Sequence, residues 1–291
     1  MGRRVLMLVN REKPGADDVA ARVHAAVERF GTLVGEENAE WGELRGFGGD
    51  GGGEVDLVVV LGGDVTLMAL SRRCLGLGVP LLGVNAGRVG FLAEFDADAV
   101  EAQAEALFGD GELSLRRHPV LRAEVGGEVA GIAVNEAVVT AGPPYRMIEL
   151  CLRIDGEAGP KLSGDGLIVG TPMGSTAYNL SAGGPIVAPE VDGLVITPIA
   201  AHSLAFRPIV VVGESVVELE LLRANAGNGE NPGTALVLDG QVNRRLGEGD
   251  RVTIRREGRS VSFVRNGSAS YWQTVIQKLH WAAPPRERDR G

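Results

Sequence analysis

Aromatic residues, cysteines and histidines are scarce in this sequence, and each shortage excludes a class of protein. Phe, Trp and Tyr make up only 4% of the 291 residues, so a surface that stacks nucleic-acid bases on aromatic rings is not expected. The two cysteines, Cys74 and Cys151, are too few for a disulfide framework, and we expect both thiols to be reduced. The four histidines show no spacing typical of metal ligands, so no metal site made by protein side chains alone is predicted.

Positive charge is also in deficit, and long hydrophobic runs are missing. Asp and Glu number 38 against 29 Lys and Arg, which gives a net charge of −9 and disfavours a general nucleic-acid binder. The apolar run within Arg4–Asn10 is too short for a signal peptide or a membrane span. We therefore expect a cytoplasmic protein with no nucleic-acid or membrane partner. With 44% hydrophobic residues, the chain can bury a sizeable core in one or two domains.

Strand-like and helix-like segments alternate over roughly the first 116 residues. Some runs are apolar almost throughout, as strands buried on both faces are, whereas others repeat apolar residues at helical spacing. The expected strands are Arg4–Asn10, Val55–Leu61 and Pro80–Asn85, and the expected helices are Ala16–Phe30, Leu67–Leu75 and Ala97–Phe108. This alternation predicts an α/β domain over residues 1–116 with a parallel sheet. A glycine-rich loop is expected at Gly46–Gly53.

The pattern changes near His118, where short strand-like segments follow one another, among them Val129–Ala141, Arg251–Arg255 and Val261–Val264. Many of them alternate apolar and polar residues, which predicts an all-β sandwich over residues 117–265. One short helix is expected near Gly174–Ala182. We expect residues 266–291 to return to the N-terminal domain and to end in a disordered tail at Pro284–Gly291.

The first glycine loop, Leu61-Gly-Gly-Asp-Val-Thr66, lies where a buried strand ends and a helix begins. Ligands of open α/β sheets bind beyond the carboxyl ends of the strands, and Gly62 and Gly63 would let the backbone approach a phosphate. Thr66 can cap the helix or bond a phosphate oxygen. Asp64 would repel a phosphate, so it suggests a role in orienting a hydroxyl or holding a metal ion. An ordinary strand-to-helix turn with Asp64 as the N-cap is an equally good reading of this fragment.

Two further segments place polar residues beside apolar strands. Gly83–Leu92 holds three glycines, Asn85 and Phe91 directly after a strand, and two glycine loops at neighbouring strand ends favour a shared cleft. Asn135 and Glu136 interrupt an apolar strand, and one of them must point inward because neighbouring residues in a strand face opposite sides. The inward side chain is either part of a site or paired at a sheet edge or at a bulge.

The segment Asp165–Pro185 is rich in small and hydroxyl-bearing residues, and it runs from a strand through a loop into the short helix. Small residues leave room for a flat ligand, and hydroxyl and N–H groups can bind it. Ser175 and Ser181 lack the Gly-x-Ser-x-Gly spacing of a nucleophile, so a catalytic serine is not predicted. His202 is either a ligand contact or, as is more usual for a lone histidine, a structural residue.

Together these segments resemble the NAD kinase family, over about residues 1–265 and in the order found in the family. The matching segments are Gly62–Thr66, Val84–Leu92, Asn135–Glu136, Gly164–Pro185 with its Gly174-Ser-Thr-Ala-Tyr178 block, His202–Pro208 and Leu238–Gln241. The resemblance implies a Rossmann-like α/β domain, a C-terminal β-sandwich and transfer of a phosphoryl group to the 2′-hydroxyl of the adenosine ribose of NAD, which gives NADP. A lipid or sugar kinase could share the Gly-Gly-Asp loop but would leave Gly174–Tyr178 unexplained.

The resemblance also implies roles for single residues. Asp64 is the expected catalytic residue, which orients the 2′-hydroxyl, and Gly62, Gly63 and Thr66 are expected to bind the phosphate donor. The residues expected to bind NAD are Asn85, Phe91, Asn135, Glu136, Asp165, Thr176, Ala177, Tyr178, Ser181, His202 and Gln241. Phosphoryl transfer needs mainly positioning and charge neutralisation, so Mg²⁺ or another divalent cation is expected with ATP or polyphosphate rather than in a protein cage. The family further implies a homodimer or homotetramer whose NAD site can borrow residues from a neighbouring subunit.

Val65 departs from the family loop, which has a glycine at this position. If the backbone here must be left-handed, Val would carry a strain of about 1–3 kcal/mol. If a phosphate must come close, the Val side chain would weaken binding of the donor instead. The main hypothesis is a working NAD kinase, and the alternative is an NAD- or NADP-binding protein of the same fold with weak or no kinase activity.

Overall fold

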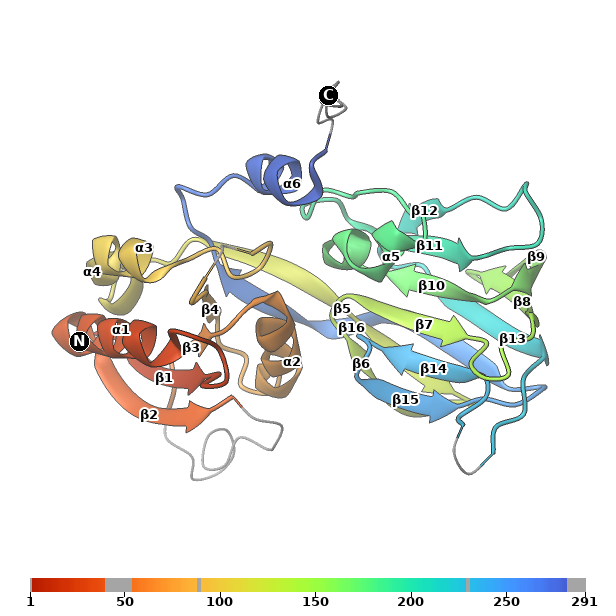
Figure 1. Ribbon diagram of the computed structural model, residues 1–291, viewed down its shortest axis with the longest axis horizontal. Helices are drawn as coiled ribbons and strands as arrows, with labels where there is room; N and C mark the ends of the chain where they lie inside the picture. The colour runs from red at the N-terminus through yellow and green to blue at the C-terminus, as the bar shows by residue number, and fades with distance from the viewer. Residues whose placement is uncertain (1, 40–53, 88–89, 229–230, 282–291) are drawn as a thin grey trace, which may run out of the picture. The chain divides into compact units, whose positions relative to one another are not determined.

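The computed structural model describes residues 2–39, 54–87, 90–228 and 231–281 (Figure 1). The chain divides into two compact units, one made of residues 1–117 with 261–291 and the other of residues 118–260. The expected loop Gly46–Gly53 and the expected tail Pro284–Gly291 lie outside the described residues.

The first unit is an α/β domain built on parallel strands in the order β2-β1-β3-β4, followed by the end of β16. Its strands are β1 (Arg4–Val9), β2 (Thr32–Asn38), β3 (Leu57–Leu61) and β4 (Leu81–Val84). Its helices are α1 (Ala16–Phe30), α2 (Asp64–Cys74), α3 (Ala97–Ala102), α4 (Ala104–Phe108) and α6 (Tyr271–Leu279). Helix α1 packs against α3 and α4, while α2 packs against β3 and β4. Every residue of β3 is buried, as expected for a strand covered on both faces.

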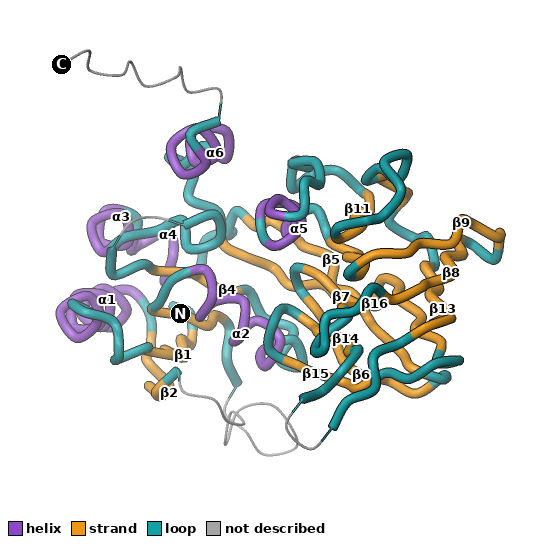
Figure 2. Tube along the Cα trace, turned by 45° about the vertical axis from the view of Figure 1, so that its right-hand side comes forward, coloured by secondary structure: helices purple, strands orange, loops and turns teal. Residues whose placement is uncertain are grey.

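The second unit consists of strands and loops with little helix (Figure 2). One antiparallel sheet has the order β12-β11-β10-β7-β14-β15, and a second set of strands has the order β16-β13-β8-β9, with β5 paired to β16 and β6 to β5. The strands are β5 (Leu115–Val125), β6 (Glu128–Ala133), β7 (Glu136–Thr140), β8 (Ile148–Ile154), β9 (Glu157–Gly164), β10 (Gly166–Gly170), β11 (Gly193–Ile199), β12 (Ile209–Val212), β13 (Val217–Arg223), β14 (Ala235–Leu238), β15 (Val242–Arg245) and β16 (Arg251–Val264). Buried side chains of both sheets, such as Val169 and Leu150, form one core. The predicted fold class is therefore confirmed.

Several element boundaries differ from the sequence-based expectation. The structure adds the strand Thr32–Asn38, whose glycine and acidic residues hid it and whose edge position leaves most side chains partly exposed. The expected helix Leu67–Leu75 begins three residues earlier, at Asp64. The expected helix Ala97–Phe108 is broken at Gln103 into α3 and α4. The short helix expected near 174–182 is a 3-10 turn, η1 (Met173–Thr176), followed by α5 (Tyr178–Ser181).

Both cysteines are free, and the described helices are short. Burial raises the pKa of the Cys74 thiol to about 12, so this thiol is unreactive at neutral pH. Among the described residues, no helix combines the length and the apolar character that crossing a membrane requires.

Candidate functional site

The carboxylate of Asp64 is fixed by the backbone of a distant loop in the first unit. Its Oδ2 accepts a hydrogen bond from the N–H of Phe91 at 2.8 Å, and its Oδ1 accepts from the N–H groups of Leu92 and Ala93 at 3.1 Å each. A Cβ atom at Gly90 would lie 1.9 Å from Oδ1, so only glycine leaves room for this arrangement. The N-cap of α2 is Gly63, so the reading of Asp64 as an ordinary N-cap is wrong.

The glycines beside Asp64 bring the backbone close to other chain segments. The N–H of Gly62 donates to the Val84 carbonyl at 2.9 Å, and a Cβ at Gly62 would lie 2.6 Å from the Cβ of Thr66. The Thr66 hydroxyl accepts a hydrogen bond from Asn10 Nδ2 at 3.1 Å. The first N–H groups of a helix have no acceptor within the helix and carry partial positive charge. This end of α2, with glycines before it, is therefore suited to an anion such as a phosphate.

Val65 adopts the ordinary backbone conformation of a right-handed helix. It is the second residue of α2, it is not among the residues with positive φ, and its side chain is 69% exposed. The left-handed conformation that would strain a β-branched residue is therefore absent at this position.

Asn85 and Phe91 lie in the loop that follows β4. The Asn85 N–H donates to the Phe95 carbonyl at 2.8 Å, and its Oδ1 accepts from the N–H of Gly87 at 3.1 Å, so its side chain shapes the loop. The Phe91 ring lies 6.2 Å from the ring of Tyr271 and has the Lys278 ammonium 5.9 Å from its centroid. Helix α6 therefore contributes to the surroundings of Phe91.

In the second unit, Asp239 fixes the backbone around Asn135 and Glu136. Its Oδ2 accepts from the N–H of Val134 at 2.8 Å, while its Oδ1 accepts from the N–H groups of Asn135 at 2.8 Å and Glu136 at 3.1 Å. The N–H of Asp239 returns a hydrogen bond to the Glu136 carbonyl at 3.0 Å. Four hydrogen bonds thereby connect two segments that lie about one hundred residues apart in the sequence.

Glu136 is a buried acid in an interior strand, so the edge-strand reading does not apply to it. Its side chain is 6% exposed, and its Oε2 has no hydrogen-bond partner among the described residues. Burial, and then the negative charge of Asp239, raises the pKa of the Glu136 carboxyl to about 8. Glu136 is therefore largely protonated at neutral pH, with an oxygen that a bound ligand can satisfy.

The Thr171–Ser175 turn joins the two predicted motifs of the second unit. The Thr171 N–H donates to the Asn135 carbonyl at 2.8 Å, and its hydroxyl donates to the Val134 carbonyl at 2.8 Å. The N–H of Gly174 donates to the same hydroxyl at 3.1 Å, and a Cβ at Gly174 would lie 2.2 Å from the Asn135 carbonyl oxygen. The structure thus brings the Asn135–Glu136 pair and the start of the Gly174–Tyr178 block together.

Of the remaining predicted residues, several lie near this turn. Thr176, the last residue of η1, and Ala177 are partly buried, whereas Tyr178 and Ser181 are exposed on α5. Gln241 is partly buried, and its N–H donates to the Leu238 carbonyl at 3.0 Å.

Sequence reasoning missed two supporting residues, Asp239 and Asn179. The fully buried Asn179 amide donates to the Ser175 carbonyl at 2.9 Å and the Pro185 carbonyl at 3.0 Å, and it accepts from the Thr197 hydroxyl at 2.6 Å. Its position inside the Gly164–Pro185 block was the one signal that could have identified it.

Asp165 and His202 lie at the opposite end of β10 from Thr171. The N–H of Asp165 donates to the Ile199 carbonyl at 3.0 Å, and the N–H of His202 donates to the Ser163 carbonyl at 2.8 Å. Both side chains are exposed. Strand β10 separates Asp165 from Thr171 by six residues, or about 20 Å. The structure therefore does not bring Asp165 and His202 next to the Asn135–Glu136 pair within one chain.

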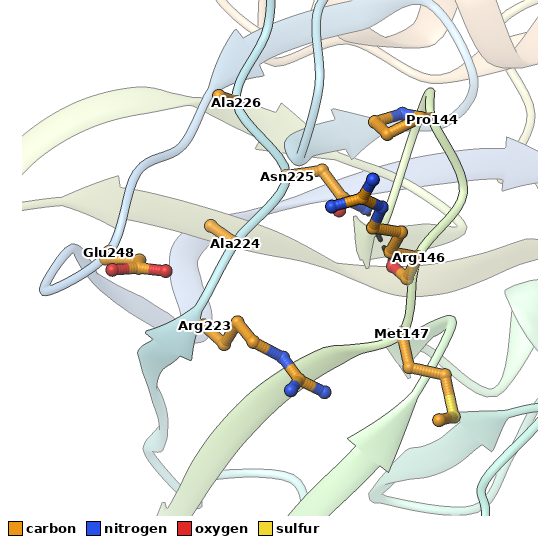
Figure 3. A pocket seen from close by; sticks show the side chains of 8 residues that line it. All are labelled: Pro144, Arg146, Met147, Arg223, Ala224, Asn225, Ala226 and Glu248. Carbon is orange, nitrogen blue, oxygen red and sulfur yellow. Dashed lines mark hydrogen bonds between the residues drawn. The ribbon is translucent and has the colours of Figure 1, made fainter.

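A cleft of about 760 Å³ in the second unit includes none of the predicted site residues (Figure 3). It is lined by Pro144, Arg146, Met147, Arg223, Ala224, Asn225, Ala226 and Glu248. Asn225 Nδ2 donates to the Arg146 carbonyl at 2.7 Å, and Arg223 pairs with Glu149 at 3.2 Å. Among the described residues, no group of three or more His, Cys, Asp and Glu side chains could hold a metal ion.

Comparisons with known proteins give a consistent result. The ATP-NAD kinase N-terminal domain model matches residues 49–112, and the ATP-NAD kinase C-terminal domain model matches residues 134–266. The NAD kinase of Wolinella succinogenes is 36% identical over 284 residues, which cover 96% of this chain and 95% of that protein. The NAD kinase of Thiobacillus denitrificans is 42% identical over 234 residues, which cover 78% and 77%.

Two solved structures share the fold. An NAD kinase from Archaeoglobus fulgidus in complex with ATP matches with a TM-score of 0.72 at 25% identity, covering 95% of this chain and 98% of that one. Yeast NADH kinase complexed with NADH matches with a TM-score of 0.77 at 20% identity, covering 99% and 90%. At this low identity, the yeast structure supports the fold alone.

Proposed function

The chain belongs to the NAD kinase family and phosphorylates NAD to give NADP, and we propose that Asp64 orients the acceptor hydroxyl for this reaction. The observation that carries the proposal is that three backbone N–H groups donate hydrogen bonds to the Asp64 carboxylate beside the glycine loop. Oδ1 accepts two of these hydrogen bonds and Oδ2 accepts one, so Oδ2 can accept a further hydrogen bond from a hydroxyl. The acceptor is the 2′-hydroxyl of the adenosine ribose, and Asp64 accepts its proton late in the transfer.

We propose that the phosphate donor binds at Gly62, Gly63 and Thr66. ATP is the preferred donor in this proposal because the Archaeoglobus relative was solved with ATP, and inorganic polyphosphate is the alternative. Free N–H groups at the start of α2 and two glycines without side chains favour close approach of phosphate oxygens. In-line transfer then depends on positioning and electrostatics rather than on a covalent nucleophile.

A divalent cation, Mg²⁺ in the simplest case, is proposed to arrive with the donor phosphates. The oxygens of Asp64, the acid at the glycine loop, are already engaged by backbone N–H groups, which suits a cation held mainly by phosphate and water. When bound, such a cation neutralises charge on the transferring phosphoryl group.

The NAD side of the reaction is proposed to use the residues around the Asn135–Glu136 pair. Glu136 has a buried oxygen with no hydrogen-bond partner in the described part of the chain, and a ribose hydroxyl would satisfy it. The further residues proposed to bind NAD are Asn85, Phe91, Thr176, Ala177, Tyr178, Ser181 and Gln241. Thr176 and Ala177 are small and only partly buried, so a flat ring could pack against them.

Asp165 and His202 support a proposal about oligomeric state. They lie about 20 Å from Thr171 along β10, so they are poorly placed to share one NAD molecule with Glu136 of the same chain. We propose a homodimer or homotetramer in which a neighbouring copy supplies Asp165 and His202. Mixed oligomers of a Glu136→Ala chain and an Asp165→Ala chain, each inactive alone, are expected to recover activity, because one combined site is intact. No recovery in verified mixed oligomers would place both residues in one chain.

The role of Asp64 is tested with Asp64→Asn. NADP formation is measured with Mg²⁺ and either ATP or polyphosphate, and NAD binding is measured separately. We expect a loss of kcat with NAD still bound. Near-full turnover of the variant would exclude Asp64 as the residue that orients the hydroxyl.

A further inference from the structure

A lysine that forms no ion pair with any of the described residues lies against the glycine loop of the first unit. Lys13 belongs to the turn after β1, where its N–H donates to the Asn10 carbonyl at 3.3 Å and its own carbonyl accepts from the Ala16 N–H at 3.1 Å. Its ammonium nitrogen would lie 3.0 Å from a Cβ atom placed on Gly63. A positive charge is therefore held directly over the backbone that begins α2.

The turn that carries Lys13 is tied to the glycine loop by backbone and side-chain hydrogen bonds. Strands β1 and β3 are parallel neighbours, with Val9 opposite Leu61 at their carboxyl ends. Just beyond them, the Asn10 N–H donates to the Leu61 carbonyl at 3.0 Å, and Asn10 Nδ2 donates to the Thr66 hydroxyl at 3.1 Å. The backbone of the Lys13 turn is thus fixed beside the glycine loop, and the Lys13 side chain reaches Gly63 from there.

The charge of Lys13 differs from that of its neighbour Arg11. Arg11 forms ion pairs with Asp17 and Glu36, so its charge is already compensated. Lys13 forms no ion pair with any of the described residues, and its side chain is exposed. An uncompensated ammonium beside two glycines and a helix N-terminus is suited to phosphate oxygens.

We propose that Lys13 binds the phosphates of the donor at the Gly62–Gly63 loop and holds them for transfer. The proposal rests on the proposed placement of the donor at this loop. Asp64 brings a negative charge to the same loop, and Lys13 offsets its repulsion of the polyanionic donor. Lys13 takes no proton and forms no covalent bond in the transfer, because it acts by electrostatic attraction and position alone.

The test compares Lys13→Met with Lys13→Arg and with the matched control Arg11→Met. Each variant is assayed for kcat and for the KM of ATP and of NAD, and Mg-ATP binding without NAD is measured by titration calorimetry. We expect Lys13→Met to weaken Mg-ATP binding and raise the KM of ATP by roughly 10- to 100-fold, with the KM of NAD little changed. Lys13→Arg should restore much of the binding, and Arg11→Met should resemble the unmodified chain in ATP binding.

A Gly63→Ala variant separates failure of this proposal from failure of the donor site itself. Among the described residues its added Cβ meets only the movable end of Lys13, so the fold should tolerate it while phosphate approach is crowded. If Gly63→Ala weakens Mg-ATP binding and Lys13→Met does not, the role of Lys13 is overturned and the loop remains the donor site. If neither variant affects Mg-ATP binding, both proposals fail. Equal weakening of ATP and NAD binding in Lys13→Met would also overturn the proposal, because it would show a structural effect.

Discussion

The side chain of Asp239 accepts a hydrogen bond from the Glu136 N–H at 3.1 Å, and its own N–H donates to the Glu136 carbonyl at 3.0 Å. The two residues are 103 positions apart, and both side chains are buried. Asp239 therefore acts as a positioning residue that sets the backbone on which Glu136 is presented. Its negative charge also keeps the pKa of Glu136 high.

An Asp239→Asn substitution is expected to weaken both stability and NAD binding. An amide offers one acceptor oxygen in place of two, so at least one of the N–H groups at residues 134–136 loses its partner. We expect the free energy of unfolding to fall by about 1–3 kcal/mol and the KM of NAD to rise, with the KM of ATP unchanged. Urea unfolding and steady-state kinetics measure these effects.

Asp155→Asn is the matched control for that substitution. Asp155 and Asp239 both have a positive φ. The Asp155 side chain accepts a hydrogen bond from the Val216 N–H at 2.8 Å and lies in a loop without predicted site residues. It should lose stability without a change in the KM of NAD. An equal rise in the KM of NAD for both variants would contradict the positioning role of Asp239.

Glu136 is expected to make the stability of the protein depend on pH. Its pKa is raised from 4.5 to about 8 on folding, so the folded chain retains a proton that the unfolded chain releases. This contribution to stability is complete below about pH 4.5 and is lost as the pH rises towards about 8. Its full size is on the order of 5 kcal/mol. In Glu136→Gln, the free energy of unfolding should fall less between about pH 6 and about pH 9 than in the unmodified protein, as measured by urea unfolding. If the free energy of unfolding falls equally in the variant, groups other than Glu136 cause the pH dependence.

Gly90→Ala should disturb the reaction through Asp64. The new methyl group would lie 1.9 Å from Asp64 Oδ1, so the carboxylate or the loop must move. A displacement of this size is expected to lower kcat by roughly 100-fold. Gly87→Ala, in the same loop, meets no atom of the described residues closer than 3.9 Å and should retain most of the activity. Equal activity of the two variants would show that the position of Asp64 is not critical.

Val65→Gly is expected to give no gain in turnover. Val65 is helical and exposed, so glycine relieves no backbone strain and instead lowers helix stability by about 0.5 kcal/mol. NADP formation and thermal unfolding of the two proteins provide the comparison. A clear increase in kcat or in affinity for ATP would show that the Val65 side chain crowds the donor.

The arrangement of the strands was predictable in broad terms but not in detail. The fold class is confirmed because apolar runs and alternating patterns reflect burial directly. The expected strand Val129–Ala141 is instead two strands, and the break at Val134–Asn135 coincides with the N–H groups that Asp239 binds. Conversely, the expected strands Arg251–Arg255 and Val261–Val264 are one continuous strand, β16. In both cases the outcome depends on a distant partner that local pattern does not specify.

The amino-acid sequence by itself determined which half of the chain is α/β and which is all-β, which loops are rich in glycine and which family the chain resembles. The first two features follow from local backbone preferences and from burial patterns within single segments, whereas the resemblance rests on short motifs in the sequence. Only the tertiary structure decided that Asp64 is bound by residues 91–93, that Asp239 supports Asn135 and Glu136, and that Lys13 lies over Gly63. The physical reason is that a hydrogen bond or a charge contact requires its two atoms to lie within about 3 Å of each other. For residues far apart in the sequence, only the folded chain brings their atoms this close.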